Sequence, residues 1–442
     1  MYFNWLTARF RFSSPISRAT ADSGTQTTVN IIQDRGTLDK LCGNAENRAP
    51  YKEREVRDHP WMFANVTKNE LVRCLGPNDI GQTAKLVTYR GGYKVICTYS
   101  WKQVEDPTIY VPGTPARWTP PDTLRKLNPD EGRHWIDQHA TRAAVHQFEP
   151  LLQALFVANP ELRFDDIDIV INRTTLLNLL KFVSKKSVQA FHFTLDLIGK
   201  TLFVGRKVAH AKGSPAEGSC GHNFEKEFTT EDPDLEHAEG HHRVLLYSFG
   251  GLRIIVRIEV DAYVEIDSEP ASTSDPSASS ENGPTQNIAH SGPYRTTVIK
   301  GGRTISQENI MELKSNQTQV PKDQMWFGRT PYCGLGSFPQ KHPRDYAKGK
   351  VEVKQMSMGD FETWEKENQL GLQKLVWLLE ELRNVTKENG AAIAVFLGKD
   401  EPRPEGAAEG SKKPDPSLRV YTAKDKVGAL PDEIVEKFWS GK

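Results

Sequence analysis

Two acidic motifs offer the clearest chemistry in this sequence. Glu259 and Asp261 stand two residues apart in an otherwise apolar run, and Glu312 and Lys314 have the same spacing farther along the chain. Because side chains alternate between the two faces of a strand, each pair would point to one side of a sheet. If the two strands pair, three carboxylates and one ammonium group come together.

A divalent metal ion would explain such a cluster. Crowded carboxylates repel one another and usually have cations among them. Oxygen ligands without Cys or His favour Mg²⁺ or Mn²⁺ over Zn²⁺, and one or two such ions can activate a water and offset charge at a phosphorus centre. Lys314 would position that water or offset the same charge. The alternative is that both tripeptides are ordinary solvated strand faces, but their position after apolar β-rich runs favours a metal site.

The elements that would position these residues alternate between strand and helix patterns. Two β-rich runs, 244–248 and 253–266, flank Phe249-Gly250-Gly251 and predict a β-hairpin. Other runs predict strands by their β-branched and aromatic content or helices by their apolar spacing. Strands are expected at 95–101, 168–171, 190–197, 201–204, 307–314 and 391–397, and helices at 140–158 (two short ones, separated near Pro150), 174–183 and 361–385. We therefore predict an α/β (α+β) fold with a mixed, curved central β-sheet flanked by helices.

Composition along the chain predicts one main domain with polar segments around it. Residues 1–84 are polar and weakly periodic, which predicts a flexible basic and polar N-terminal arm. Residues 85–400 would form the catalytic domain, and 401–442 a C-terminal tail. Within the domain, residues 268–293 are rich in Ser, Pro, Thr, Asn and Gly, so a disordered insert is expected there.

Charge and cysteine content narrow the partners and the compartment. Lys+Arg and Asp+Glu both number 57 in the 442 residues, so a site for a polyanion must be local. The five cysteines never form CxxC, which indicates a reducing compartment rather than a disulfide framework. No apolar run is long enough for a membrane span, and no membrane partner is expected. We expect a nuclear or cytoplasmic protein, although Arg9, Arg11 and Arg18 would also suit a mitochondrial transit peptide or a flexible basic tail.

Four segments in series resemble the motifs of the decapping exoribonuclease family, a group within the PD-(D/E)xK nuclease superfamily. They are residues 221–225, which end in Glu225, residues 242–246, the pair Glu259 and Asp261, and the pair Glu312 and Lys314. The resemblance is to a divergent, fungal-looking branch. It implies a PD-(D/E)xK nuclease-like core whose metal ligands are Glu225, Glu259, Asp261, Glu312 and the Leu313 carbonyl. The implied reaction is metal-dependent hydrolysis at RNA 5′ ends, as decapping, 5′ pyrophosphohydrolysis or 5′–3′ exonuclease action.

The same resemblance implies two phosphate contacts. A family arginine set between a strand and an apolar helix corresponds to Arg173, which would meet RNA phosphate; an exposed loop or cap arginine is the alternative. Residues 324–330 resemble a family W-W-x-Q-S element, with Arg329 in the glutamine position. Arg329 would bind a phosphate, or it would mark altered substrate choice or lost activity. Asp261→Asn and Glu312→Gln are both expected to abolish turnover with little loss of folding.

Two other functions stay open at this point. A zinc site would use residues from a Cys- and His-rich stretch, although the glycine and acidic turn within it do not suit a helix. Those residues are Cys220, His222, His237, His241 and His242. The second alternative is a catalytically weak or inactive member of the same fold that binds RNA 5′ ends or a protein partner. Arg329 and the neutral net charge favour it, whereas the presence of all five site residues argues against it.

Overall fold

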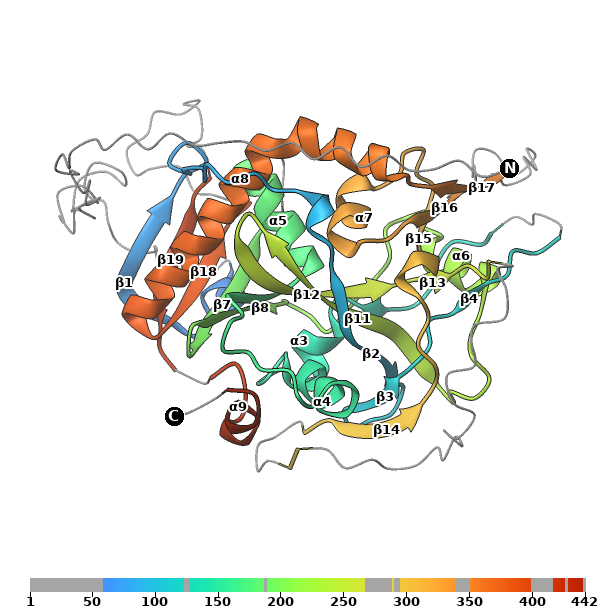
Figure 1. Cartoon of the computed structure of the whole chain (residues 1–442), viewed down its shortest axis with the longest axis horizontal. Helices are drawn as coiled ribbons and strands as arrows, with labels where there is room; N and C mark the ends of the chain where they lie inside the picture. Colours follow the sequence, from blue (N-terminus) through green and yellow to red (C-terminus); the bar gives the residue numbers. More distant parts are fainter. Residues whose placement is uncertain are drawn as a thin grey trace, which may run out of the picture.

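A long curved β-sheet crosses the computed structural model, which describes residues 59–122, 127–186, 189–266, 288–289, 295–338, 350–398, 416–425 and 428–439 (Figure 1). The sheet has eleven strands. In spatial order they are β1 (Val66–Leu75), β19 (Leu418–Ala423), β18 (Ala391–Phe396), β7 (Phe191–Ile198), β8 (Thr201–Lys207), β6 (Ile169–Asn172), β12 (Leu252–Val260), β11 (Ala238–Phe249), β2 (Lys94–Lys102), β3 (Thr108–Pro112) and β14 (Thr297–Gly301). Strand β6 pairs in parallel with β8 and β12 among antiparallel neighbours, so the sheet is mixed, as predicted.

A second, smaller sheet adjoins the first. It has six strands, and a two-stranded ribbon forms a third sheet. The six are β10 (Thr229–Thr230), β4 (Arg117–Trp118), β13 (Ala262–Tyr263), β15 (Ile310–Ser315), β16 (Tyr332–Ser337) and β17 (Lys350–Gln355), and the ribbon is β5 (His134–Trp135) with β9 (Lys212–Gly213). The chain leaves β12 in the large sheet and enters β13 in the small one after a single residue, Asp261.

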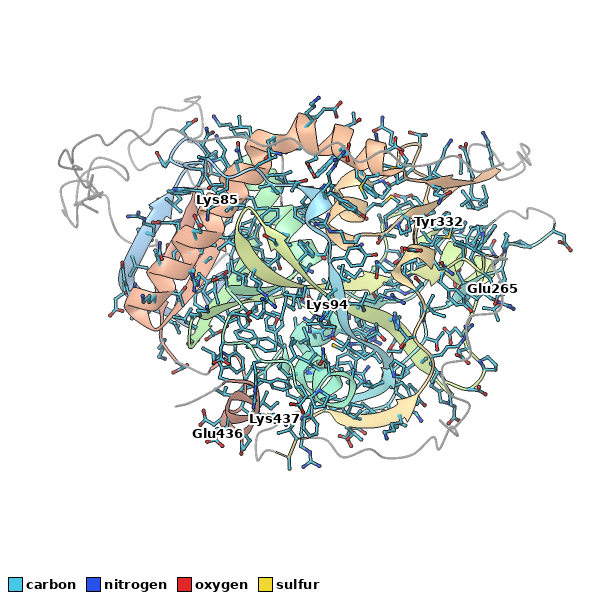
Figure 2. All side chains as sticks on the ribbon, in the orientation of Figure 1. Lys85, Lys94, Glu265, Tyr332, Glu436 and Lys437 are labelled. Atoms are coloured by element: carbon cyan, nitrogen blue, oxygen red, sulfur yellow. The ribbon has the colours of Figure 1, made fainter. Side chains whose placement is uncertain are left out.

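Helices cover both faces of the large sheet (Figure 1). On one face lie α5 (Arg173–Val183), α7 (Lys322–Gly328) and α8 (Met358–Asn389), and on the other α4 (Glu149–Ala158) and α9 (Asp432–Phe438). Two shorter helices are α3 (Gln138–Arg142) and α6 (Gly221–Phe228). Figure 2 shows side chains filling the space between these layers. Each face of the sheet therefore has its own apolar core.

Strand β12 shows how the sequence builds these two cores. Ile254, Val256 and Ile258 pack against the helices α5 and α8, whereas Ile255 packs on the side of α4. Alternation along the strand then places Arg257 and Glu259 on the same side as Ile255. A polar pair at the end of an apolar strand is thus aimed away from the larger core.

The predicted hairpin is confirmed as β11 and β12, which pair from His241 opposite Val260 to Phe249 opposite Leu252. The two-residue loop is Gly250-Gly251, and both glycines have positive φ, 58° and 93°. Paired positive φ values are typical of the tight turns that match strand twist, and glycine adopts them without strain. A Cβ on Gly250 would also come within 2.6 Å of Val376 on α8, so the turn fits closely under that helix.

Most predicted elements are present, with shifted ends. The two short helices expected over 140–158 are α3 and α4, with Pro150 in the first turn of α4 rather than at a break. The helix expected over 361–385 is α8, which begins at a capping box of Ser357 and Asp360 and buries Leu372, Leu375 and Leu379. The strand expected over 307–314 starts with a 3₁₀ turn at Gln307–Asn309 and becomes extended only in β15.

The polar segments at both ends differ from the expectation. Strand β1 lies inside the predicted arm, 1–84, and pairs with β19, which lies inside the predicted tail, 401–442. Leu75 and Leu418 pair with each other and are both buried. This pairing therefore buries apolar side chains even though both segments are polar on average. Residues 1–58 and most of the predicted insert, 268–293, lie outside the described residues. Among the described helices, none has the length and hydropathy needed to cross a membrane.

Candidate active site

Asp261 marks the point where the two sheets meet. Strand β13 pairs antiparallel with β15, with Ala262 opposite Met311, so the pairing expected between the two acidic motifs is present. It brings Asp261 beside the second motif, where the Leu313 N–H donates a hydrogen bond to Oδ2 of Asp261 at 2.7 Å. A backbone contact therefore fixes the carboxylate of Asp261 next to Glu312 and Lys314.

Glu312 is buried, with 2% of its surface exposed, and two cations hold it. Arg173, the first residue of α5, donates from Nη1 to Oε2 at 2.7 Å and from Nη2 to Oε1 at 3.3 Å. The Lys314 Nζ donates to Oε1 at 2.6 Å. Burial alone would raise the pKa of Glu312, but Arg173 and Lys314 lower it to about 2. Glu312 is therefore a carboxylate at any physiological pH.

Lys314 links the two motifs electrostatically. Its Nζ lies 3.8 Å from Oδ2 of Asp261 as well as 2.6 Å from Glu312. Burial would lower the pKa of Lys314, but the two carboxylates raise it above its ordinary value. Lys314 thus stays a cation at the edge of the cluster.

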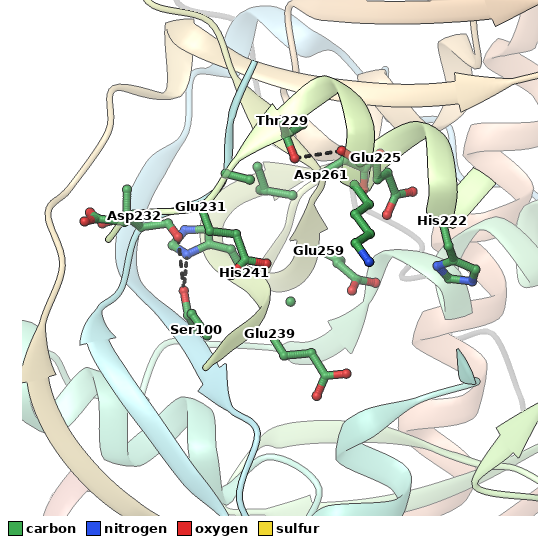
Figure 3. Close-up of a pocket in the computed structure, with 16 residues that line it drawn as sticks. Ser100, His222, Glu225, Thr229, Glu231, Asp232, Glu239, His241, Glu259 and Asp261 are labelled. Atoms are coloured by element: carbon green, nitrogen blue, oxygen red, sulfur yellow. Dashed lines mark hydrogen bonds between the residues drawn. The ribbon is translucent and has the colours of Figure 1, made fainter. Parts of the chain in front are cut away.

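Three carboxylates share a pocket of about 550 Å³ beside this ion-pair network. Figure 3 shows Glu225 from α6 together with Glu259 and Asp261, and Ser100 with His241 on the opposite side. We call this hollow the acidic pocket, because Glu231, Asp232 and Glu239 also line it. It collects the three carboxylates that the sequence predicted to act together with Glu312.

The carboxylates of this pocket crowd one another. Burial and then Glu312 raise the pKa of Asp261 to about 6, against the opposing effect of Lys314. The side chain of Glu259 is exposed to the pocket, but protein atoms surround it on all other sides; this enclosure, followed by Asp261, raises its pKa to about 7. For Glu225, burial, Asp261 and Glu259 raise the pKa well above its ordinary value. The ionised forms are unfavourable together, and a cation among them would relieve that repulsion.

The oxygen donors of the acidic pocket are of the kind that binds a hard divalent cation. They are, however, too far apart to coordinate one ion as they stand. The facing donors from Glu225, Glu259 and Asp261 are carboxylate oxygens, which Mg²⁺ and Mn²⁺ prefer. In the described parts of the chain, no three Asp, Glu, His or Cys side chains stand where they would already hold a metal ion. Metal binding therefore requires side chains of the acidic pocket to shift toward one another. Nothing in the structure tests the Leu313 carbonyl as a ligand, which stays a prediction.

A family model described as a domain of unknown function, DUF8563, matches residues 69–439. The chain belongs to this family. No curated protein matches the sequence.

Solved structures with a distant likeness to this DUF8563 chain include two fungal Rai1 proteins and one Dxo1. Rai1 of S. pombe in complex with 3′-FADP is 11% identical, with 79% of this chain and 98% of that chain covered and a TM-score of 0.47. Rai1 of Candida albicans in complex with pU5 and Mn²⁺ is 12% identical, with 83% and 98% covered and a TM-score of 0.47. Dxo1 of K. lactis in complex with manganese is 9% identical, with 79% and 97% covered and a TM-score of 0.42. Such values are too low to transfer a ligand or a reaction, so the chemistry must come from this chain's own residues.

Arg173 and Arg329, the two predicted phosphate contacts of the DUF8563 chain, lie in different surroundings. Arg173 is buried against Glu312, as described above. Arg329 is 2% exposed, and its guanidinium lies 4.1 Å from the ring centre of Tyr89, 4.4 Å from that of Tyr247 and 4.6 Å from that of Trp326. The structure does not bring Arg329 to the acidic pocket, because cation–π contacts hold it within the aromatic core. The sequence could not show this, since the enclosing rings come from three separate segments.

Replacing Arg329 should therefore affect stability rather than turnover. Arg329→Gln removes the cation–π contacts and leaves a shorter amide among aromatic rings, so we expect the free energy of unfolding to fall by about 2 kcal/mol. Turnover per folded molecule should stay within about twofold of the wild type, since the residue is outside the pocket. Urea unfolding and substrate turnover measure the two effects, and Arg329→Lys, which keeps a cation, is the control. A loss of turnover in folded Arg329→Gln would place Arg329 in the reaction after all.

The residues of the zinc alternative do not gather at one point. His237 lies in a turn with φ 57°, whereas His241 is buried in β11, where its Nδ1 is 2.9 Å from the Ser100 Oγ. His222 stacks on His134 with ring centres 3.6 Å apart, and Cys220 is buried beside Asn316. The i, i+4 spacing of His237 and His241 falls on a turn and a strand, so it does not produce a helical metal-binding pair.

A buried polar network beside the acidic pocket escaped the sequence analysis. Arg257 donates from Nε to Asn172 Oδ1 at 2.9 Å and from Nη1 to the Gln147 carbonyl at 2.8 Å, and Tyr99 Oη lies 2.7 Å from His139 Nε2. One signal was available: Arg257, Glu259 and Asp261 recur at every second position, so the arginine shares a face with Glu259. The partners of Arg257 come from other segments and could not be predicted.

The raised pKa values predict that the metal-free acidic pocket loses stability as the pH rises from about 4 to about 7. Asp261 and Glu259 have higher pKa values in the folded than in the unfolded chain, so the folded protein binds more protons in this interval. Protons therefore favour folding, and this contribution is lost as the pH rises through the folded pKa values. Buried His242, whose pKa burial and Arg257 lower to about 3, and Glu312 act in the opposite direction.

The difference between the wild type and Asp261→Asn isolates the carboxylates. Urea unfolding in EDTA at pH 5 and pH 7.5 should show the wild type losing more stability over this interval than the variant. The matched control is Glu265→Gln, an exposed acid farther along the same segment. Identical pH dependence in wild type and Asp261→Asn would show that the carboxylates do not interact.

Proposed function

We propose that this chain is a divalent-metal-dependent hydrolase of RNA 5′ ends, acting by decapping, 5′ pyrophosphohydrolysis or 5′–3′ exonuclease cleavage. The observation that carries the proposal is that Glu225, Glu259 and Asp261 share one pocket, crowd one another and adjoin the cation Lys314. A cation would offset the excess negative charge in this cleft, and the oxygen-only donors indicate Mg²⁺ or Mn²⁺. The motif order matches that of the decapping exoribonucleases, which supports RNA 5′ ends as the substrate. Nuclear or cytoplasmic localisation is proposed with it.

The side chains divide the work between holding a metal and handling charge. Glu225, Glu259 and Asp261, with Glu312 behind them, would hold one or two ions, which when bound lower the pKa of a water and offset charge on the phosphate. Glu259 and Asp261 would lose their protons when a metal ion binds, because their raised pKa values belong to the metal-free pocket. Lys314, kept charged by its neighbours, can stabilise negative charge that develops at phosphorus. Arg173 would position Glu312 through the bidentate ion pair.

The test is metal-dependent release of label from three RNAs with the same body. Their 5′ ends would carry a triphosphate, a monophosphate or an unmethylated cap, and each reaction would be run with Mn²⁺, with Mg²⁺ and with EDTA. We expect turnover of at least one RNA with metal and none in EDTA. A folded protein that binds Mn²⁺ yet cleaves none of the three RNAs would contradict the proposal.

A non-catalytic RNA-binding module is the second candidate, and one observation favours it. Both oxygens of Glu312 already accept hydrogen bonds from Arg173 and Lys314, so the acid most deeply buried in the cluster is neutralised without a metal. Under this alternative the RNAs bind with similar affinity in Mn²⁺ and in EDTA and are never cleaved. The substrate panel therefore separates the two candidates.

A further inference from the structure

A second hollow, of about 350 Å³, lies on the large sheet and shares no lining residue with the acidic pocket. Its lining includes residues of β7, β8 and β18, which are neighbours in the sheet (Figure 1). The segment that joins α3 to α4 also lines it, as do residues just before β1 and at the end of β19. We call this hollow the β7 pocket, because the middle strand of its floor supplies most of the polar groups.

Three polar side chains of β7 stand on this floor. His192, Thr194 and Asp196 occupy every second position of the strand, so they share one face, and all three line the β7 pocket. The residues between them pack in the apolar core on the side of α8. Gly205 of β8 stands opposite Thr194, and a Cβ there would lie 2.4 Å from Thr194 Oγ1. The glycine therefore leaves room for the threonine hydroxyl at the bottom of the hollow.

Asp196 has no partner for its charge. Within the part of the chain that the structure describes, its half-buried carboxylate makes no hydrogen bond and no ion pair, and Thr194 Oγ1 makes no hydrogen bond either. Burial alone raises the pKa of Asp196 to about 7. His192 is different, because its Nδ1 donates to the Met62 carbonyl at 2.9 Å and burial lowers its pKa to about 4. The β7 pocket thus holds one unpaired acid beside a hydroxyl and a neutral imidazole.

The rest of the lining is small and mostly apolar. Six of the lining residues are alanines, and Val145, Phe148 and Ile393 add larger apolar side chains. Lys207 and Asp425 also line the hollow, and both are exposed. Apolar walls with a few polar groups at one place are typical of sites for small molecules, in which the polar groups fix the orientation of the ligand.

The chemistry of Asp196 selects among ligand classes. An unpaired carboxylate that is partly removed from water is stabilised by a cation or by hydrogen-bond donors. An anion would instead be repelled by Asp196, and a neutral apolar molecule would bury the carboxylate without a partner. One carboxylate and one hydroxyl are too few for a hard metal ion, which takes six or more oxygen ligands. A ligand with one charged donor group and an apolar body satisfies both the floor and the walls.

We propose that the β7 pocket binds a small organic cation, a primary amine or a guanidine with an apolar body, whose charged group pairs with Asp196 and donates to Thr194. This binding site lies outside the acidic pocket and does not depend on the proposed hydrolysis of RNA. The apolar body of the ligand packs against the alanines, Val145 and Phe148.

The test compares two probes that have the same apolar body, phenethylamine and phenethyl alcohol, by calorimetric titration at pH 8. The wild type should bind the amine with a dissociation constant of about 1 mM or tighter, and about tenfold more tightly than the alcohol. Asp196→Asn should lose this preference for the amine. The variant should fold, because it removes an unpaired carboxylate and leaves no other charge without its partner.

The affinity of the wild type for the amine should also fall about tenfold from pH 8 to pH 6, because Asp196, with a pKa of about 7, must lose its proton to pair with the ligand. An alkylamine stays charged over this interval. Among the other titratable groups that line the hollow, His192 stays neutral, and Lys207 and Asp425 are exposed. Asp196→Asn should therefore bind the amine with little dependence on pH.

Two further variants locate the binding. Ala144→Trp, at an exposed residue of the lining, should weaken binding of the amine about tenfold by filling the hollow while Asp196 stays in place. Asp261→Asn is the matched control, because the acidic pocket also attracts cations, and it should bind the amine as the wild type does. Loss of amine binding in Asp261→Asn with retention in Asp196→Asn would assign the cation to the acidic pocket and overturn the proposal. Equal affinity of the wild type for the two probes, or no binding of the amine, would overturn it as well.

Discussion

Asp261→Asn should lower the rate of metal-dependent RNA hydrolysis by about 100-fold or more, the scale at which removing one charge-stabilising group acts. The same variant should make the metal-free protein more stable at pH 8, by about 2 kcal/mol, because the pKa of Asp261 is raised to about 6 in the folded state. Asparagine keeps an oxygen that can accept the Leu313 N–H. Lys314 keeps Glu312 as its partner at 2.6 Å, so the substitution leaves no buried charge alone.

Initial rates on the most reactive RNA and urea unfolding in EDTA would measure the two effects. Glu265→Gln again serves as the control, because Glu265 is exposed and pairs with Arg117 outside the cluster. Lower activity together with higher stability is expected for a charged residue that binds a ligand and does not stabilise the fold. A variant that is less stable and fully active would place Asp261 among ordinary structural residues.

Arg173→Met should lower the free energy of unfolding by about 3–5 kcal/mol, since it leaves the buried Glu312 carboxylate with Lys314 as its one remaining cation. Glu312→Gln should have a comparable effect, because it removes the carboxylate that pairs with the buried guanidinium of Arg173. The double variant Arg173→Met/Glu312→Gln should cost less than either single change, as both charges leave together. Lys314 would still have Asp261 at 3.8 Å.

Urea unfolding of the four proteins forms a double-mutant cycle that measures the coupling directly. An interaction energy below about 1 kcal/mol in this cycle would show that the pair is weakly coupled, as exposed ion pairs are. The sequence alone predicts that Glu312→Gln loses little folding. The buried ion pair between Arg173 and Glu312 predicts instead that this variant is destabilised. Asp261→Asn is therefore the cleaner test of catalysis.

Local pattern was enough to predict the parts of the site that lie on one strand. The period of two along β12 predicted that Glu259 and Asp261 share a face, and Gly250-Gly251 predicted the hairpin that holds this strand. Strand β13 has two residues and no signal of its own, yet its pairing with β15 brings the motifs together. The shared face of the two acids was predictable from the alternation along β12. The change of sheet at Asp261 was not, because the short strand β13 leaves no pattern in the sequence.

Contacts between distant segments account for what the sequence did not predict. Arg173 and Glu312 are 139 residues apart, and neither segment indicates that they form a buried bidentate pair. Strands β1 and β19 come from segments that are polar on average, and only their pairing creates a buried surface. Arg329 and Arg257 illustrate the same point for one residue type: aromatic rings enclose the first, and the second is buried against Asn172 and the Gln147 carbonyl.

Calorimetric titration of Mn²⁺ into the metal-free protein at pH 6.5, in two buffers of different ionisation enthalpy, shows whether the acidic pocket binds a divalent metal ion. We predict saturable binding with release of protons, because ligands with raised pKa values must ionise to coordinate the metal, and we expect Asp261→Asn to lose most of this binding. No saturable binding, or equal binding by the wild type and Asp261→Asn, would contradict the assignment of the acidic pocket as a metal site.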